Sequence, residues 1–105
     1  MYMNRRSVDR GFYYRVLWRM YELCNNGRWV TARELMAYFP ELAMLDEKDK
    51  EEGRMWPRGT ARLCAALYWL EKKGLIKSRK IKGRRKEYRP AIKRERLLER
   101  ILRIT

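Results

Sequence analysis

Lysine and arginine side chains crowd the stretch from residue 77 to residue 89. They are Lys77, Arg79, Lys80, Lys82, Arg84, Arg85, Lys86 and Arg89. Cations in such number neutralise phosphates and release the counterions that surround a nucleic acid. Gly83 divides the stretch, and Ile81 and Tyr88 are its apolar residues, which is typical of a short β-hairpin. The chemistry indicated here is the binding of a polyanion, with no covalent step.

A helix directly before this hairpin must position it. We expect the helix to span residues 60–73, with Thr60 as its N-cap, because a threonine hydroxyl accepts an orphan amide of the first turn. Leu63, Leu67 and Leu70, with Ala66 beside them, recur at helical spacing and predict one buried stripe. A glycine at position 74, after two lysines, is a common helix end.

The remaining sides of this helix are candidates for contact with base edges. The candidates are Arg58, Thr60, Arg62, Ala65, Tyr68 and Lys72. We expect Arg62 to make a bidentate contact to guanine. Trp69 is expected to pack on a neighbouring helix or on a dimer partner, whereas both packing and base contact stay open for Tyr68. The backbone contacts are assigned to the hairpin cations named above, and to Arg5 and Arg6 in an N-terminal basic arm, residues 1–11.

The composition of the chain favours a nucleic-acid partner. The 105 residues suit one domain, and the formal net charge is +14 with a pI of about 10.3. Histidine is absent, and no phosphate-binding glycine loop, nucleophile motif or metal-ligand spacing occurs. We therefore expect a binding protein rather than an enzyme, with no cofactor and no metal. No residue pattern in the sequence indicates a particular small-molecule effector.

The cellular compartment is also constrained by the sequence. No segment is long and apolar enough to cross a bilayer and the N-terminus lacks a secretory apolar core, so we expect an intracellular, cytoplasmic protein. Glutamine is absent and charge is abundant, which hints at a thermophilic source. For Cys24 and Cys64 we favour two buried free thiols, and a disulfide between them is the alternative.

The elements before the basic region follow from local signals. Tyr13, Val16, Leu17, Met20, Leu23 and Cys24 predict the core side of a helix over residues 12–24. Residues 28–30 form a brief extended link, short enough for one edge strand. A capping box at residues 31–34, with Thr31 as cap and Glu34 three positions later, begins a second helix that Pro40 ends or interrupts.

An acidic connector, residues 41–59, separates the second and third helices. It contains the run DEKDKEE at residues 46–52, whose net charge is −3. Pro40 suits the first turn of a short helix in the connector, ended by Gly53. We expect the acids to project away from a bound duplex, either as a solvated loop or as the exposed end of that helix. Arg54 and Arg58 would then lead into the groove, and replacing all five acids by serine should raise duplex affinity slightly.

A basic amphipathic helix is predicted at the C-terminus, residues 91–105. Its apolar face holds Leu97, Leu98, Ile101, Leu102 and Ile104. Three roles stay open: closing the domain's own core, pairing with a second copy across a two-fold axis, or lying on an anionic membrane. We favour the homodimer, with Leu97, Leu98, Ile101 and Leu102 at its interface, and expect no membrane binding.

The order of these elements resembles that of winged helix-turn-helix transcriptional regulators such as the PadR and MarR families. The resemblance rests on Thr31 to Leu35 and on Ala66 to Ile76, which is similar to the end of their recognition helix. The hairpin with Gly83 and Tyr88 is similar to their wing. The resemblance covers residues 12–90 and is specific between about residues 60 and 89. It implies a mostly α-helical α+β fold with a small β-hairpin wing, that is, a winged helix-turn-helix with an additional C-terminal helix. The long acidic connector and the pair Tyr68-Trp69 depart from the family pattern.

The resemblance implies sequence-specific binding of double-stranded DNA by a small transcriptional regulator, more often a repressor than an activator. The helix over 60–73 would enter the major groove, and the wing over 77–89 would hold the backbone. The alternative is a winged-helix module that binds RNA or a protein partner in a larger assembly, because a fold alone does not fix a function.

Overall fold

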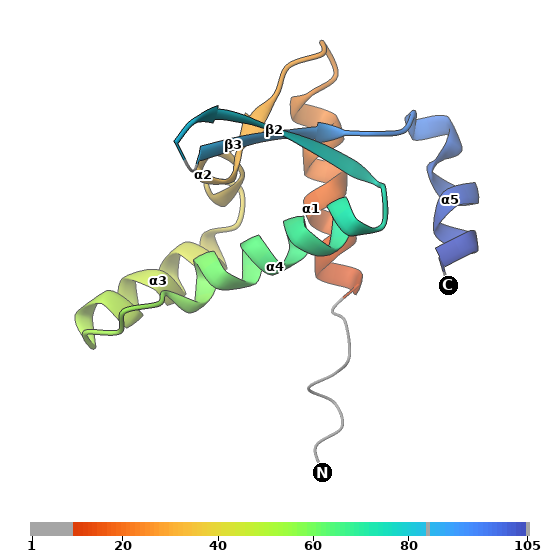
Figure 1. Ribbon diagram of the computed structural model, residues 1–105. Coiled ribbons are helices and arrows are strands. Elements are labelled where there is room, and N and C mark those ends of the chain that lie inside the picture. Colours follow the sequence, from red (N-terminus) through yellow and green to blue (C-terminus); the bar gives the residue numbers. More distant parts are fainter. Residues whose placement is uncertain (1–9, 84, 105) are drawn as a thin grey trace.

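A computed structural model describes residues 10–83 and 85–104, and shows a mostly helical α+β fold with one small antiparallel sheet (Figure 1). The helices are α1 (Arg10–Leu23), α2 (Ala32–Met36), α3 (Pro40–Glu51), α4 (Arg58–Lys72) and α5 (Leu97–Ile104), the last preceded by a single 3₁₀ turn, η2 (Arg94–Arg96). The strands are β1 (Val30–Thr31), β2 (Ile76–Lys82) and β3 (Arg85–Pro90).

The sheet has the strand order β1-β3-β2, so the hairpin strand β3 is central and the two-residue β1 is an edge strand, as expected. Val30 pairs with Tyr88, and Ile76 pairs with Pro90 at the other edge. The chain passes directly from α4 through the turn at Gly74, whose φ is +77°, into β2. Helix α4 and the hairpin are therefore fixed to each other by a single tight connection.

The core lies where α1, α2 and α4 meet the sheet. Its buried side chains include Val16, Leu17 and Met20 from α1, together with the predicted stripe of α4, Leu63, Ala66, Leu67 and Leu70. Burial of an aliphatic side chain of this size contributes about 1.5–3 kcal/mol. The periodicity of the sequence located this core, and Phe12 and Tyr21 are further buried members that it did not single out.

The starts of α2 and α3 are set by local chemistry. The Thr31 hydroxyl accepts the Glu34 amide at 3.1 Å, and a Glu34 carboxylate oxygen accepts the Thr31 amide at 2.9 Å. This confirms the predicted capping box. Pro40 occupies the first turn of α3, so it begins a helix rather than merely ending one. Among the described residues, none of the helices has the length and hydropathy needed to cross a bilayer.

Candidate nucleic-acid interface

The hairpin places cations opposite cations. Of the six cross-strand pairs of β2 and β3, three juxtapose two positive residues: Lys77 with Arg89, Lys80 with Lys86, and Lys82 with Arg85. Only Arg79 with Glu87 is an oppositely charged pair, joined at 2.9 Å. Like charges directly opposite each other destabilise a strand pair. The hairpin therefore carries an internal repulsion that a bound polyanion would relieve.

The two faces of the hairpin differ, because successive side chains of a strand point to opposite sides. Lys77, Arg79 and Arg89 share one face, where each lies over the ring of Trp29 at 4.3–6.0 Å from its centroid. Lys80 and Lys86 share the other face with Tyr88, which packs against the core. The predicted hairpin cations are thus divided between two surfaces rather than gathered on one.

A groove lies between α2, α4 and β3 on the face that carries Tyr88. Its volume is about 450 Å³, and it is lined by Thr31, Ala32, Arg33, Cys64, Arg85, Lys86 and Tyr88. A second hollow of about 230 Å³ shares Ala32, Arg33 and Cys64 and extends to Thr60. The structure thus joins two predicted hairpin cations with Arg33, a cation that sequence reasoning missed because it lies within the capping box.

The face of α4 that is turned to solvent is lined mainly by small side chains. Ala61, Cys64, Ala65, Tyr68 and Lys72 are exposed and recur at helical spacing. Small residues allow close approach of a partner, and an alanine methyl group suits contact with a thymine methyl group. Tyr68 is exposed, with the Lys72 ammonium 5.6 Å from its ring centroid, so it does not pack on a neighbouring helix of this chain. Base contact and packing on a dimer partner both stay open for it.

Two other predictions on α4 have different outcomes. Trp69 packs against α1, where the rings of Tyr13 and Tyr14 lie 5.3 and 6.1 Å from its own, so the expected packing role is confirmed. The Arg62 guanidinium lies 4.4 Å from the ring centroid of Phe12 on α1. Arg62 is therefore directed toward the start of α1, and its assignment to guanine stays a prediction.

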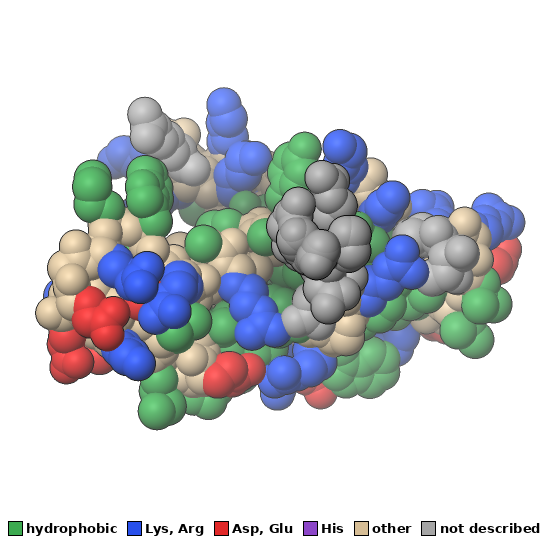
Figure 2. Space-filling view, turned by 90° about the horizontal axis from the view of Figure 1, so that it is seen from below, with side chains coloured by type: hydrophobic (Ala, Val, Ile, Leu, Met, Phe, Trp, Pro, Cys, Tyr) green, Lys and Arg blue, Asp and Glu red, His purple; other side chains and the backbone are tan. Residues whose placement is uncertain are grey.

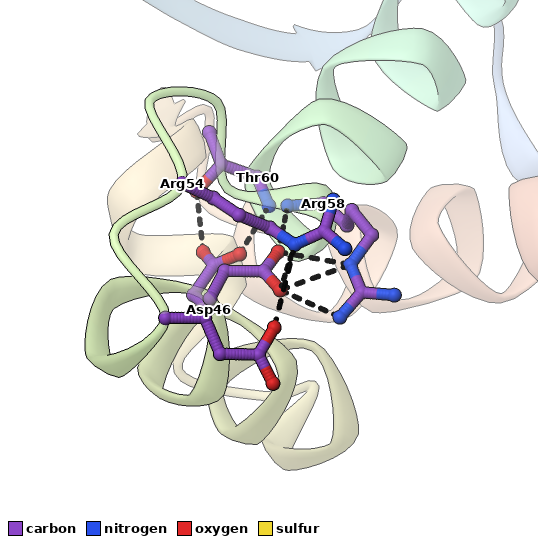
Figure 3. Close-up of polar contacts among 6 residues, drawn as sticks. Asp46, Arg54, Arg58 and Thr60 are labelled. Carbon is purple, nitrogen blue, oxygen red and sulfur yellow. Dashed lines mark hydrogen bonds and ion pairs between the residues drawn. The ribbon is translucent and has the colours of Figure 1, made fainter.

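Two aspartates of α3 hold the first turn of α4 (Figure 3). Asp49 accepts the backbone amide of Arg58 at 2.8 Å and its guanidinium at 2.6–3.0 Å. Asp46 accepts the amide of Thr60 at 3.0 Å and its hydroxyl at 2.6 Å. Hydrogen bonds from the Arg58 side chain lower the pKa of Asp49 to about 2. Two orphan amides of α4, those of Arg58 and Thr60, are thus capped by carboxylates from another helix.

This arrangement corrects three expectations. Thr60 is not the N-cap, because α4 begins at Arg58 after Pro57 and the Thr60 hydroxyl donates to Asp46. The acidic run is helical, as one version of the prediction had it, yet Asp49 is fully buried instead of solvated. The premise of the five-acid replacement, that these acids project into solvent, fails for Asp46 and Asp49, which hold the start of α4, while the expected slight rise in duplex affinity stays a prediction.

Capping by the chain's own carboxylates also removes the helix start as a phosphate site. A helix N-terminus attracts anions through its free amides and its dipole. Here Asp46 and Asp49 already occupy that position. The guanidinium of Arg58 is turned back onto Asp49, so the lead-in to the groove expected of Arg54 and Arg58 is largely engaged within the protein. The candidate interface therefore centres on the hairpin and the exposed face of α4.

The two cysteines are both free, so the alternative of a disulfide is not realised. Cys24 is buried, as expected, but Cys64 is exposed in the groove, because it lies one residue beyond the inward-facing Leu63 on α4. Desolvation by its surroundings raises the pKa of the Cys64 thiol. The expectation of two buried thiols therefore holds for Cys24 alone.

The C-terminal helix is only partly attached to the body. Leu97 packs against the core, whereas Leu98 and Leu102 are 69% and 65% exposed. Ile101 is half-buried. The connection is anchored earlier, where the Tyr21 hydroxyl donates to the carbonyl of Ile92 at 2.6 Å. Closing the core thus accounts for Leu97, and a dimer interface that includes Leu98 and Leu102 stays a prediction.

Three of the predicted backbone contacts, Arg5, Arg6 and Arg84, lie outside the described residues. Comparisons of this chain with protein families, with curated proteins and with solved structures gave no match.

Proposed function

We propose that this chain binds double-stranded DNA as a winged-helix protein, with β2 and β3 as the wing and the exposed face of α4 as the element that meets the major groove. The observation that carries the proposal is the set of three cation–cation pairs in the hairpin. A protein keeps such repulsion at a cost of about 0.2–1 kcal/mol for each pair, which a phosphate backbone would offset.

The topology supports the same proposal. A helix that leads directly into a hairpin resembles the arrangement of winged-helix regulators, in which the helix would enter the groove and the wing would hold the backbone. Lys80, Arg85 and Lys86 would contact phosphates without reading sequence. Ala61, Ala65 and Tyr68 would meet base edges, and Lys72 and Arg33 would flank them.

The biological role proposed is that of a small transcriptional regulator that recognises a particular site, with repression as its effect. Footprinting on the DNA upstream of the protein's own gene tests sequence specificity, because small regulators often act there. Protection of a discrete site supports the proposal. Equal affinity for every duplex, or a preference for single-stranded RNA, would favour the alternative of an RNA-binding or adaptor module.

A pair of double variants tests the wing directly. Replacing Lys80 and Lys86 by alanine should weaken binding to all duplexes alike and reduce the salt slope by about 2, since about one unit is lost for each phosphate contact. Stability should stay constant or rise, because a like-charge pair is removed. The matched control replaces Lys48 and Lys50 on α3, which removes the same charge from the acidic end of the molecule. Equal losses in the two variants would mean that only net charge matters, and would sink the assignment of the wing.

A further inference from the structure

Two of the hairpin cations, Lys77 and Arg89, have no part in the proposed duplex contacts. They form a cross-strand pair at the root of the hairpin, on the face that carries Trp29. Ser78, the next residue of β2, points to the opposite face, where its hydroxyl donates to Glu71 of α4 at 2.7 Å. A duplex seated on α4 would therefore leave Lys77 and Arg89 uncovered.

Both side chains line a groove where α1, the root of the hairpin and the segment that leads into η2 meet. The groove has a volume of about 580 Å³. Lys93 and Arg94 line it from the start of η2, and Glu95 is the acidic side chain among its described lining residues. In the described part of the chain, none of the four cations forms an ion pair. We call this hollow, with its four cations, the cationic groove.

Hydrogen bonds hold the walls of the cationic groove in place. The Tyr21 hydroxyl of α1 donates to the carbonyl of Ile92 at 2.6 Å, and the Ala91 amide donates to the carbonyl of Leu75 at 3.0 Å. These bonds tie the segment after β3 both to α1 and to the residue before β2. A preformed site of this kind loses less conformational entropy when a ligand binds.

Aromatic rings position the two arginines of the groove. The Arg94 guanidinium lies 4.6 Å from the ring centroid of Trp18, and that of Arg89 lies 5.5 Å from the ring centroid of Trp29. Such contacts hold a cation without neutralising its charge. The Nε of Arg89 is also buried without a hydrogen-bond partner among the described residues. A buried donor without an acceptor is unfavourable, so the guanidinium of Arg89 is still short of an acceptor.

The positive charge continues from the cationic groove onto α5. A neighbouring hollow of about 370 Å³ shares Lys93 and is lined further by Arg96, Arg100 and Arg103, together with the acid Glu99. Figure 2 shows lysine and arginine side chains bordering the end of the molecule formed by α5. Gathered cations of this kind raise the local concentration of small anions.

Phosphate groups fit the side chains of the cationic groove best. Guanidinium groups bind phosphate oxygens through paired hydrogen bonds, and ammonium groups add a compact charge. Four cations against one described lining acid exceed the charge of a carboxylate or of one phosphate. The volume also lies within the range of about 300–1,000 Å³ that is usual for small-molecule sites. We propose that the cationic groove binds a small anion with two linked phosphates, a diphosphate, on a surface separate from the duplex interface.

Amide NMR spectra of the full chain, titrated with inorganic pyrophosphate in the absence of nucleic acid, test this proposal. At about 150 mM salt the Debye length of about 8 Å screens isolated surface charges. The shifts should saturate, and they should be largest for the residues that line the cationic groove. Adenosine diphosphate identifies the source of the diphosphate: tighter binding than that of pyrophosphate assigns the site to organic diphosphates, and equal or weaker binding assigns it to the inorganic ion.

Exposed lysines provide a matched pair of variants. Replacing Lys77 and Lys93 by glutamine should weaken pyrophosphate binding by about tenfold or more, because charge-assisted hydrogen bonds are lost. Replacing Lys48 and Lys50 on α3 by glutamine removes the same charge far from the groove and should keep the parent affinity. Arg89→Lys keeps the net charge but loses the guanidinium fork, so it should also weaken binding.

Four results would overturn the proposal: no saturable binding by the parent, equal losses in the two lysine variants, shifts spread evenly over all the cationic surfaces, or orthophosphate that binds as tightly as pyrophosphate. A fifth is a loss of duplex affinity in the Lys77 and Lys93 variant that exceeds the loss in the Lys48 and Lys50 control, since the groove would then belong to the DNA interface. Because the titration uses no DNA, failure of the parent to bind a duplex refutes only the proposed function.

Discussion

At the scale of single residues, Cys64 can serve as a chemical probe of what occupies the groove. It is the exposed thiol, lies at the meeting of α4 with β3, and its pKa is raised by desolvation, whereas Cys24 is buried in the core. Alkylation requires the thiolate and access to it. The two cysteines therefore form a built-in pair of probe and control for what occupies the groove.

We predict that duplex DNA slows alkylation of Cys64 several-fold and leaves the slow reaction of Cys24 unchanged. The reaction is followed by mass spectrometry in alkaline buffer, because desolvation raises the pKa of the Cys64 thiol, with and without excess duplex. Protection should disappear at high salt as the complex dissociates. A Cys64 that reacts equally fast in the bound protein would place the DNA elsewhere on the molecule.

Asp49 is the residue on which the start of α4 depends. Its folded-state pKa, about 2, is lower than the ordinary value of 3.8 for an aspartate, because Arg58 donates hydrogen bonds to the carboxylate. Between these values the folded protein binds fewer protons than the unfolded chain. The stability that Asp49 supplies is therefore complete above about pH 4 and is lost as the pH falls toward 2.

We predict that Asp49→Asn lowers the free energy of unfolding at pH 7 and flattens its decline between pH 4 and pH 2. Denaturant unfolding at a series of pH values measures both effects. Glu47→Gln is the control, because Glu47 is an exposed acid of the same helix. If the Asn variant and the parent show parallel pH profiles, the carboxylate is not the group that ties α3 to α4.

At the scale of elements, features set by local signals could be predicted from the sequence, whereas features set by tertiary contacts could not. The capping box at Thr31 and Glu34 was predictable because its donors and acceptors are three residues apart. The stripe of α4 was predictable from its period. The start of α4 was not predictable, because its caps come from Asp46 and Asp49 on another helix. The pairing of Lys80 with Lys86 became visible only when the hairpin register was known. The groove likewise needed three elements brought together by the fold.

Gly59 shows how closely α3 and α4 approach each other. A Cβ atom added there would overlap the carbonyl group of Leu42 and press on the Asp46 side chain. Alanine is the better helix former by about 1 kcal/mol, so propensity alone would make Gly59→Ala stabilising. The overlap with backbone should reverse that sign.

We predict that Gly59→Ala lowers the unfolding free energy by about 1–3 kcal/mol, the usual cost of overpacking. Thermal and denaturant unfolding give the value. Ala61→Gly is the matched control, because Ala61 is exposed two residues further along the same helix and should report propensity alone, a loss of about 1 kcal/mol. A more stable alanine variant at position 59 would mean that the two helices are further apart.

At the scale of the whole molecule, the charge is separated along the fold. The acids of residues 46–52 lie on α3, and the hairpin carries closely spaced cations next to α4. The proposed contacts to a phosphate backbone therefore belong to the hairpin rather than to α3.

The dependence of duplex affinity on salt concentration tests the central claim, that the hairpin and α4 hold a DNA backbone, most directly. With six to ten phosphates contacted, affinity should fall by about 10³- to 10⁵-fold between 50 and 200 mM salt, along a straight line of log affinity against log salt. The Lys80 and Lys86 double variant should give a line that is less steep by about two units, and the Lys48 and Lys50 control should keep the parent slope. A nearly salt-independent affinity of the parent protein would contradict the account.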